Sequence, residues 1–491
     1  MAIDCDVCIV GAGIAGLNAL FSASRYLSPD QKVVLVDRRA RVGGMWVDTY
    51  PYVRLHQPHP MFTAGNIKWT LGKDPSYLAT KGEVLDHLRY CLDVIKQRVQ
   101  VAEYFGWDFE SGAETDGLVR VTCRNANGDV AVINAKRLIK AYGLAATPNA
   151  PLAISSSRLN SVSPDYCDIR SGALRDSDAP VWIIGGGKTA MDTAYTLITE
   201  YPGREVNLVA GRGTFFGTRE QIFPVGARRW WDGVLLAKVA SEMGRRFDGT
   251  NETEVQSWYR GAYTNSVTPD ANNYVLGVLS QAENKTIAAG LNEVVMDYFA
   301  DAVDRNGTTE LVFRSGATTT IEPGSWVINC TGYVGLNDYP YEPYVSGSGA
   351  VVSINLRSAV LHLPAFMGYF LTHLMFSDKI RDLPLYELDW KGLRDKSPIA
   401  FPYTVFALVQ HNLSLIYESL PSRVFNDNGL DFDRWYPLPR RLPAMARFMF
   451  THRRERERQR RVLDTVRERF DVRCGPLRAC GPSDLQPQGA S

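Results

Sequence analysis

The 491-residue sequence predicts an α/β fold with two similar strand–turn–helix units and a mostly helical C-terminal region. Three observations predict this fold. At residues 7–23 an apolar strand runs into a glycine-rich turn and then into a helix with apolar residues at three- and four-residue spacing. The same pattern restarts at residues 181–190, and the last third of the chain is aromatic and helical in its spacing. At this length we expect two or three domains.

The first unit has the glycine spacing of a dinucleotide-binding turn. Gly11, Gly13 and Gly16 form Gly-x-Gly-x-x-Gly and enclose Ile14 and Ala15. The first glycine permits a tight turn, the second lets the backbone approach a pyrophosphate, and the third lets the helix pack closely on the strand. The free N–H groups at the start of the helix then point at the phosphates. The unit therefore predicts a Rossmann-like domain.

An acidic residue follows at the position that suits a ribose. The apolar strand at 32–36 ends in Asp37, which lies 21 residues beyond Gly16 (37 − 16), and Arg38 follows it. A carboxylate there accepts hydrogen bonds from the hydroxyls of an adenosine ribose. The strand, glycines, helix and acid in this order favour a dinucleotide site over a fortuitous glycine-rich turn.

The second unit has a similar glycine turn, but a basic residue stands where the first unit has an acidic one. Its turn and helix start comprise Gly185, Gly187, Lys188, Thr189 and Ala190. Its second strand ends without an acid and leads to Arg212, 22 residues beyond Ala190 (212 − 190). A basic side chain at this place accommodates the 2′-phosphate of NADP, although Arg219, Arg228 and Arg229 follow closely and leave the phosphate ligand open. For Lys188 two expectations stay open: that it binds the NADP pyrophosphate, or that it faces solvent.

An irregular segment follows the ribose acid. Gly43, Gly44, Met45 and Trp46 form a glycine-paired turn, and residues 50–60 contain too many prolines for regular structure. This arrangement suits a flavin whose ring must be enclosed. We therefore expect FAD on the first unit and NADPH on the second, with the nicotinamide meeting the flavin ring for hydride transfer.

Composition excludes several other classes of protein. The formal charge of +1 gives no reason to expect a nucleic-acid partner. The early first strand leaves no room for a signal peptide, and the most apolar stretch, 359–376, is interrupted by His362, Pro364 and His373, so we expect a buried helix and no integral membrane segment. Eight scattered cysteines suit a cytoplasmic protein. Cys5 and Cys8 are interpreted as core residues, and no metal site is expected.

The remaining segments are expected as follows. We predict a helix at 81–92, strands within 101–141, helices at 231–245 and 282–299, and a strand pair at 311–314 and 318–321. The apolar strand that leads to Thr331, Gly332 and Tyr333 is interpreted as a return to the first domain. Residues 451–461 are expected to form a solvated helix.

These predictions give a domain plan. Residues 1–165 form the first part of the FAD domain, 166–324 the NADP domain, 325–475 the completion of the FAD domain with the helical region, and 476–491 a disordered tail. The aromatic-rich region at 366–403 is expected to wall the substrate site, because it lacks a cofactor motif.

The chain resembles the class B flavin-dependent monooxygenases, which include the flavin-containing, Baeyer–Villiger and N-hydroxylating monooxygenases. The motifs that carry the resemblance lie at 11–16, 37, 43–46, 52–58, 141–148, 185–190 and 330–333, so it covers roughly residues 1–335. It implies that NADPH reduces FAD and that reduced FAD reacts with O2 to form a C4a-(hydro)peroxyflavin. It further implies insertion of one oxygen atom into nitrogen, sulfur, a ketone or carbon.

The sequence departs from the family at three places. The segment at 159–166 lacks the family's histidine, which weakens a Baeyer–Villiger assignment, and Lys188-Thr189 stands where the family has Asn-Ser. His56 and Gln57 stand where the family has a flavin-facing Asn, so they are the catalytic candidates, with a plain loop pair as the alternative. The resemblance adds Arg54 to the expected cofactor contacts.

Together these observations predict a monooxygenase with a small-molecule substrate and O2. Two alternatives stay open: a flavin oxidase or dehydrogenase with an adapted second unit, and a non-enzymatic flavin or NADP sensor. A disulfide reductase is rejected, because no cysteine pair follows Gly44 or Lys188. A homodimer is left open.

Overall fold

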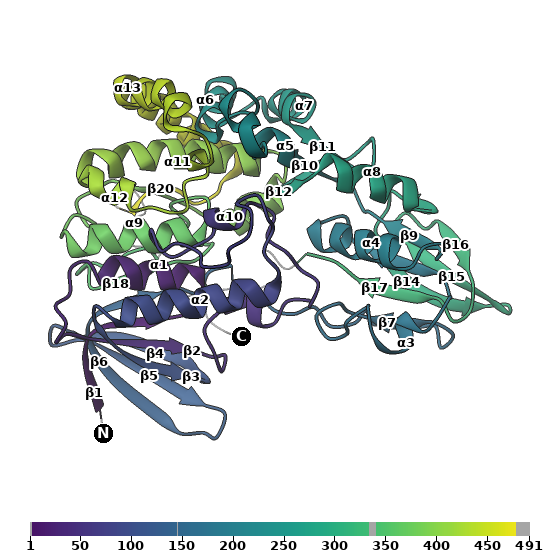
Figure 1. The fold of residues 1–491 in the computed structure, drawn as a ribbon, viewed down its shortest axis with the longest axis horizontal. Helices are drawn as coiled ribbons and strands as arrows, with labels where there is room; N and C mark the ends of the chain where they lie inside the picture. The colour runs from purple at the N-terminus through teal and green to yellow at the C-terminus, as the bar shows by residue number, and fades with distance from the viewer. Residues whose placement is uncertain (1, 145, 333–339, 478–491) are drawn as a thin grey trace.

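The computed structural model describes residues 2–144, 146–332 and 340–477. Figure 1 shows two bodies side by side, each built on a sheet, and a layer of helices above the first of them. The larger body contains the chain's N-terminal sheet, and the smaller body contains the second glycine turn.

The first body is built on a seven-stranded sheet of order β3-β2-β1-β6-β5-β4, with β18 beside β6. β1, β2, β3, β6 and β18 are parallel neighbours, and β4 and β5 extend the sheet antiparallel. Both faces of β1 are buried from Val7 to Val10, as expected of a central parallel strand. The strands are β1 (Ala2–Val10), β2 (Lys32–Asp37), β3 (Gln100–Phe105), β4 (Trp107–Thr115), β5 (Leu118–Asn125), β6 (Val130–Lys140) and β18 (Val351–Ser353).

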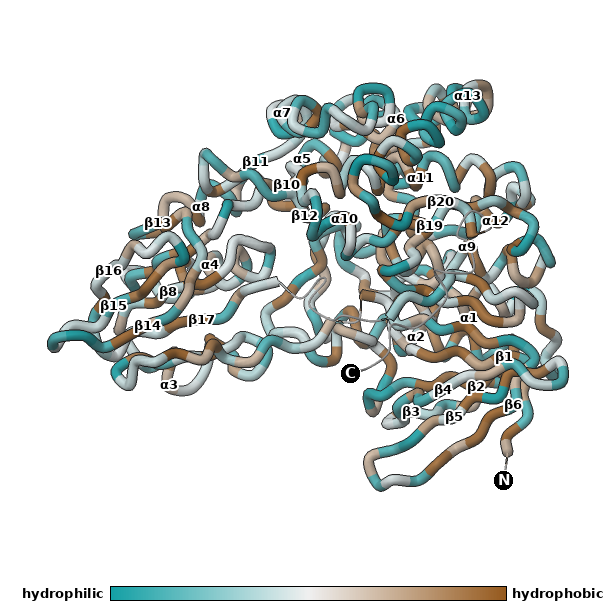
Figure 2. Tube along the Cα trace, turned by 180° about the vertical axis from the view of Figure 1, so that it is seen from behind, coloured by the Kyte–Doolittle hydropathy of each residue, from teal (hydrophilic) through white to brown (hydrophobic). Residues whose placement is uncertain are grey.

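Three helices cover this sheet and build its core. They are α1 (Ile14–Ala23), α2 (Lys81–Lys96) and α9 (Pro364–Phe376). α9 approaches α1 so closely that a Cβ on Gly368 would lie 2.3 Å from the carbonyl oxygen of Ala15. The apolar stretch that contains α9 is thus a buried helix, as predicted, and Figure 2 shows hydrophobic residues along β1, β2 and β6.

The second body is built on a parallel sheet of order β13-β9-β8-β17-β7. An antiparallel sheet, β14-β15-β16, packs beside it through Ala302 and Leu311. The strands are β7 (Asn160–Val162), β8 (Val181–Ile184), β9 (Val206–Val209), β13 (Glu293–Val295), β14 (Phe299–Arg305), β15 (Thr308–Phe313), β16 (Thr318–Ile321) and β17 (Trp326–Asn329). The helices are α3 (Gly172–Arg175), α4 (Lys188–Glu200) and α8 (Gln281–Gly290).

Further helices join the two bodies. α6 (Leu236–Arg246) and α7 (Glu252–Tyr263) pack against α11 (Ala400–Ser419), and α11 in turn packs against α13 (Leu438–Phe470). The remaining elements are α5 (Arg219–Ile222), α10 (Trp390–Lys396), α12 (Ser422–Asn426), β10 (Thr214–Thr218), β11 (Thr264–Asn265), β12 (Asn273–Leu279), β19 (Tyr386–Leu388), β20 (Cys474–Pro476), η1 (Gly44–Val47), η2 (His59–Met61), η3 (Gly226–Trp230) and η4 (Phe432–Trp435).

The structure corrects three sequence-based predictions. β17 pairs with β8 and β7, so the strand before Thr331 belongs to the second sheet and is not a return to the first domain. β7 likewise belongs to the second sheet, although it lies within the predicted range 1–165. The helix expected at 282–299 ends at Gly290, because the β-branched Val294 and Val295 pair with β9. All three corrections depend on which strands pair in the second sheet, and these strands lie far apart in the sequence.

Two further predictions concern the C-terminal part of the chain. The solvated helix expected at 451–461 is the middle of α13, which begins much earlier, at Leu438. Tyr333 and most of the expected disordered tail lie outside the described residues, and Cys474–Pro476 forms β20. Among the described helices, none combines the length and apolarity that crossing a membrane requires.

Candidate functional site

The first glycine turn connects β1 to α1 and leaves the helix N-terminus open. Gly13 is the N-cap of α1, and no side chain caps the helix there. Gly11 has a φ of +106°, and a Cβ on it would lie 2.4 Å from the carbonyl oxygen of Ala141. A Cβ on Gly16 would lie 1.8 Å from the carbonyl oxygen of Gly11. Only glycine fits these two positions, and the first turn of α1 offers its N–H groups to an anion.

The paired-glycine turn lies directly against the first one. A Cβ on Gly44 would lie 2.7 Å from the Cα of Gly13, so bare backbone lines this part of the site. Ile14 and Ala15 form the first turn of α1. In η1, directly after Gly43, Met45 is exposed. Trp46 packs edge-on against Phe62, with 5.7 Å between ring centroids. This cradle of backbone, which a Cβ would fill, fits the pyrophosphate of FAD.

Asp37 ties the end of β2 to the glycine turn. Its carboxylate accepts hydrogen bonds from the backbone N–H of Ala12 at 2.6 Å and of Arg39 at 2.8 Å. The side chain is buried, and each carboxylate oxygen keeps a further lone pair for a ribose hydroxyl. Arg38 is exposed beside it. The ribose acid thus also supports the turn that faces the phosphates.

The second glycine turn repeats the geometry of the first. Gly185 has a φ of +130°, and a Cβ on it would lie 2.4 Å from the carbonyl oxygen of Cys330 at the end of β17. Gly187 is the N-cap of α4, no side chain caps the helix, and the space around its missing Cβ is open. Ala190 is fully buried against the sheet. The N-terminus of α4 is therefore a second helix N-terminus that no side chain caps.

Lys188 begins α4, and its charge is already paired. Its ammonium group forms an ion pair with Asp192, one helical turn further on. Thr189 follows it in the first turn. A pyrophosphate at this helix N-terminus would lie beside the ion pair, not beside a free lysine.

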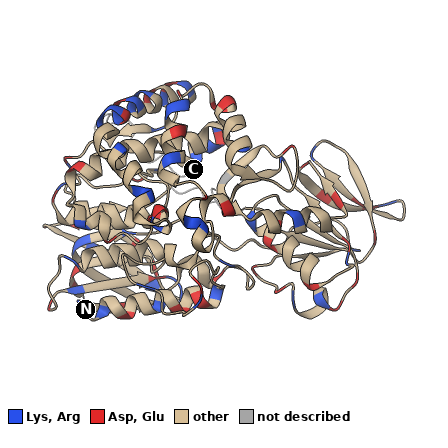
Figure 3. Cartoon of the chain, turned by 45° about the horizontal axis from the view of Figure 1, so that its top comes forward, with Lys and Arg blue, Asp and Glu red and all other residues tan. Residues whose placement is uncertain are grey.

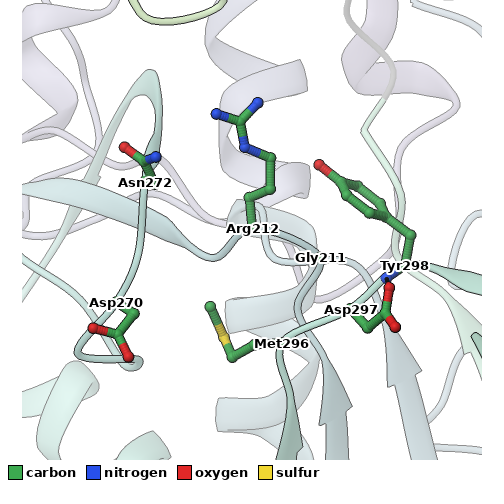
Figure 4. Close-up of a pocket in the computed structure, with 7 residues that line it drawn as sticks. All are labelled: Gly211, Arg212, Asp270, Asn272, Met296, Asp297 and Tyr298. Atoms are coloured by element: carbon green, nitrogen blue, oxygen red, sulfur yellow. Dashed lines mark hydrogen bonds between the residues drawn. The ribbon is translucent and has the colours of Figure 1, made fainter. Parts of the chain in front are cut away.

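Arg212 lies in a pocket of about 310 Å³ just after β9, shown in Figure 4. The pocket is lined by Gly211, Arg212, Asp270, Asn272, Met296, Asp297 and Tyr298. In Figure 4 the guanidinium of Arg212 points away from both carboxylates. Within the described part of the chain Arg212 forms no ion pair, so its charge is available to a ligand. Its place after β9 fits the adenosine end of a dinucleotide.

The other arginines near Arg212 in the sequence lie elsewhere. Arg219 forms an ion pair with Glu283 at 2.9 Å and donates from Nε to the backbone carbonyl of His56 at 2.9 Å. Arg228 pairs with Asp232. Of the basic candidates for a 2′-phosphate, only Arg212 lines the pocket.

The proline-rich loop of the first body touches the second glycine turn. The phenol of Tyr50 donates to Asp192 of α4 at 2.7 Å, and the hydroxyls of Tyr52 and Thr193 lie 2.7 Å apart. Burial raises the pKa of both phenols, so both stay protonated. The loop that was predicted to enclose the flavin therefore also holds the helix that was predicted to bind NADP.

His56 lies in this loop among groups of the second body. Burial lowers the pKa of its imidazole to about 3, helped by the positive charges of Lys188 and Arg219. His56 is therefore neutral near pH 7 and acts there as a hydrogen-bonding group, not as a cation. Burial would raise the pKa of Glu283, but Lys188 and Arg219 more than offset it and lower the pKa to about 2. Gln57 follows, half-buried.

The remaining predicted site residues lie in different places. Arg54 is exposed and donates to the carbonyl oxygen of Leu78 at 3.3 Å. Thr331 and Gly332 follow β17, beside the second glycine turn, and Asn149 donates to the carbonyl of Thr331 at 2.5 Å. Tyr333 lies outside the described residues.

Sequence reasoning missed three residues of this site: Tyr50, Asp192 and Glu283. The four-residue spacing of Lys188 and Asp192 on one helix is a signal that could have identified their pairing. Nothing in the local sequence indicates that Tyr50 and Glu283 converge on the same helix, because tertiary contacts bring them there.

Comparison with known proteins supports the two-unit fold. Residues 5–228 match the sequence family described as pyridine nucleotide-disulphide oxidoreductase. An uncharacterized protein of Mycobacterium bovis and one of Mycobacterium tuberculosis are each 27% identical over 210 residues, which is 40% of this chain. The matched stretch spans 36% of the length of these relatives.

Solved structures extend the similarity to most of the chain. The open crystal structure of cyclohexanone monooxygenase is 13% identical, covers 92% of this chain and 99% of its own, and superposes with a TM-score of 0.50. The flavin-containing monooxygenase of Stenotrophomonas maltophilia is 16% identical, with 77% and 98% coverage and a TM-score of 0.44. The bacillithiol disulfide reductase of Staphylococcus aureus is 12% identical, with 77% and 99% coverage and a TM-score of 0.45.

These comparisons confirm the predicted fold class, and they confirm the resemblance to flavin-dependent monooxygenases at the level of the fold. The family match also supports the predicted oxidoreductase class and a pyridine nucleotide as one of its cofactors. Over most of its length, the chain has a two-domain fold similar to that of cyclohexanone monooxygenase.

Proposed function

We propose that this protein is an FAD- and NADPH-dependent monooxygenase that transfers one atom of O2 to a small-molecule substrate. One observation carries the proposal: two glycine turns leave the N-termini of α1 and α4 uncapped, and a single loop, 50–57, connects the two sites. An enzyme that passes a hydride from one dinucleotide to another needs this juxtaposition.

In this proposal the first body holds FAD. The N–H groups of the first turn of α1 bind the pyrophosphate, Asp37 binds the ribose, and Gly44 leaves room for the backbone of the phosphate loop. When bound, FAD supplies the electron transfer and oxygen chemistry that no side chain supplies.

The second body holds NADPH in this proposal. The N-terminus of α4 binds the pyrophosphate, and Arg212 binds the 2′-phosphate in the pocket of Figure 4. Asp270 and Asp297 line the same pocket, so a phosphate must bind on the side where the guanidinium points. The domain division of 1–165 and 166–324 is proposed with the correction that β7 and β17 belong to the NADP domain.

His56 and Gln57 are proposed as the side chains that hydrogen-bond near the reactive edge of the flavin. A neutral His56 offers one N–H donor and one acceptor, and the half-buried amide of Gln57 offers both as well. Such groups orient a reactive oxygen species and restrict the access of water to it. The aromatic residues of α9 and α11 are proposed as walls of the substrate site.

The cysteines argue against a disulfide reductase, the class that the matched family's description also names. The described cysteines form no disulfide with one another, and six of the seven are buried. Burial raises the pKa of Cys5 to about 12, and likewise raises the pKa of Cys8, so neither is a thiolate at neutral pH. Cys330 lies at the second glycine turn without a second cysteine beside it among the described residues.

Anaerobic reduction followed by oxygen tests the proposal. We expect the purified protein to contain FAD, and NADPH to bleach it under anaerobic conditions. After mixing with oxygenated buffer, the spectrum of oxidised flavin should return more slowly than it does for free reduced FAD. Immediate return with stoichiometric hydrogen peroxide would indicate the oxidase alternative, and failure of NADPH to bleach the flavin would contradict the assignment of α4.

A further inference from the structure

The first half of α13 exposes an apolar stripe that its packing does not use. Leu438, Leu442, Met445 and Met449 are spaced four, three and four residues apart, so they lie on one face of the helix. Each is about half exposed, at 49–51%, and Phe450 beside them is 86% exposed. α13 lies along the edge of the molecule in Figure 1.

Two exposed tryptophans lie next to the start of this stripe. Trp230 and Trp231 are 54% and 66% exposed; Trp230 ends η3, and Trp231 follows it. Their loop is fixed to the start of α13, because Arg440 donates to the carbonyl of Arg229 at 3.1 Å and Trp435 donates to that of Pro224 at 2.9 Å. We call the stripe, Phe450 and the two tryptophans the α13 ridge.

Packing of other side chains of α13 holds the ridge in place. Phe448 packs against Tyr417 of α11, with 5.1 Å between ring centroids, and Gln459 donates to the carbonyl of Gly244 in α6 at 3.0 Å. The buried residues of the second half, among them Leu463 and Val466, complete this packing. The exposed side chains therefore belong to an ordered helix with a fixed orientation.

The half of α13 that carries the stripe is also rich in arginine. Residues 438–454 contain five arginines and no aspartate or glutamate. Arg447 is exposed and forms no ion pair with any described residue. Arg453 and Arg454 are exposed as well, and they pair with Glu418 and Glu455. The helix ribbon at the top of Figure 3 has many blue segments, which mark Lys and Arg. Glutamates interleave with arginines only from Glu455 onward.

We propose that the α13 ridge binds the surface of a membrane that contains anionic lipids. Amphipathic helices with apolar and basic residues lie in the membrane interface, where tryptophan also prefers to be, and arginine binds lipid phosphates. A second copy of the chain fits less well, since a two-fold interface would bring the five arginines of residues 438–454 of one copy near those of the other. This contact requires no membrane-spanning segment and is independent of the proposed catalytic function.

Vesicle co-sedimentation of the full chain tests this proposal. We expect binding to vesicles of phosphatidylcholine mixed with phosphatidylglycerol, weaker binding to phosphatidylcholine alone, and loss of binding in high salt. The double variants Trp230→Ser/Trp231→Ser and Leu442→Ser/Met449→Ser should each bind at least about tenfold more weakly, since each removes apolar side chains that the membrane would bury.

The control variant Leu118→Ser/Val130→Ser removes two exposed apolar residues from β5 and β6, outside the ridge. It should bind the mixed vesicles like the unmodified protein. Circular dichroism and thermal unfolding of every variant separate loss of binding from loss of fold. No binding to the mixed vesicles, or equal binding by the ridge variants, would overturn the proposal. So would a dimer in lipid-free solution that both ridge variants abolish, because a second copy would then cover the ridge.

Discussion

The phenol of Tyr50, in the loop of the first body, donates a hydrogen bond of 2.7 Å to Asp192 in α4 of the second body. Asp192 in turn holds Lys188 at the N-terminus of that helix. One contact thus connects the loop that was predicted to enclose the flavin with the helix that was predicted to bind NADP. The relative position of the two cofactors should therefore depend on it.

Tyr50→Phe tests this connection, since it removes the hydroxyl and keeps the ring. A hydrogen bond to a charged group contributes about 1.5–3 kcal/mol, so we expect NADPH to reduce the flavin about 10- to 100-fold more slowly, with unchanged FAD content. Stopped-flow absorbance under anaerobic conditions measures the rate. Tyr195→Phe, on the exposed face of the same helix, is the matched control and should leave the rate unchanged. Equal rates of flavin reduction for Tyr50→Phe and the unmodified protein would show that this hydrogen bond does not align the two cofactors.

Asp37→Ala should lower the FAD content of the purified protein. The substitution removes the proposed ribose ligand and leaves the buried N–H of Ala12 without its acceptor, which costs about 1–3 kcal/mol. Absorbance of the flavin relative to protein measures the content, and urea unfolding measures the stability. Asp37→Asn keeps an acceptor for the turn, so it should lose FAD with a smaller loss of stability. Asp30→Ala, at an exposed loop position, should retain FAD, whereas a fully yellow Asp37→Ala would contradict the ribose assignment.

Arg212→Ala should raise the KM for NADPH about 10- to 100-fold and leave the KM for NADH nearly unchanged. The reason is that a charged hydrogen bond to the 2′-phosphate, worth about 1.5–3 kcal/mol, exists only with NADPH. Steady-state oxidation of both nucleotides measures the two constants. Arg175→Ala removes an exposed arginine of the same body as a control. If both constants rose equally, Arg212 would have no role in binding the phosphate.

The local parts of this site could be predicted from the sequence, and the distant contacts could not. The glycines of both turns and Asp37 follow from spacing along one strand–turn–helix unit, because backbone geometry alone fixes their places. The pairing of β17 with β8, and the contact between Tyr50 and Asp192, join residues 142 or more positions apart. Apolar periodicity identifies a buried strand but not its neighbour in the sheet, so the domain of β17 was predicted wrongly.

The last prediction concerns stability at mildly acidic pH. Burial lowers the pKa of two histidines to about 3 and of three others to about 4, from a usual 6.5. The unfolded chain therefore binds more protons than the folded protein below pH 6.5, and the free energy of unfolding must fall as the pH falls toward 4. At pH 5 each histidine accounts for up to about 2 kcal/mol. These residues are His56, His87, His362, His373 and His411.

Urea unfolding followed by tryptophan fluorescence between pH 7.5 and 5 measures this dependence. Burial raises the pKa of Glu387 to about 7 and that of Asp433 to about 6, so these two carboxyls oppose the trend, but five histidines outweigh them. We expect the midpoint to fall steadily through this range. His87 is the most informative site for a variant, because its ring stacks on Trp69 with 3.9 Å between centroids and its Nε2 bonds Thr63 at 2.9 Å. His87→Gln loses the stacking on Trp69, so its unfolding free energy should be lower at pH 7.5. Because glutamine cannot be protonated, the unfolding free energy of this variant should also depend less steeply on pH, by about the contribution of one histidine. A midpoint that stays constant from pH 7.5 to 5 would mean that these histidines take up protons in the folded protein, which their burial forbids.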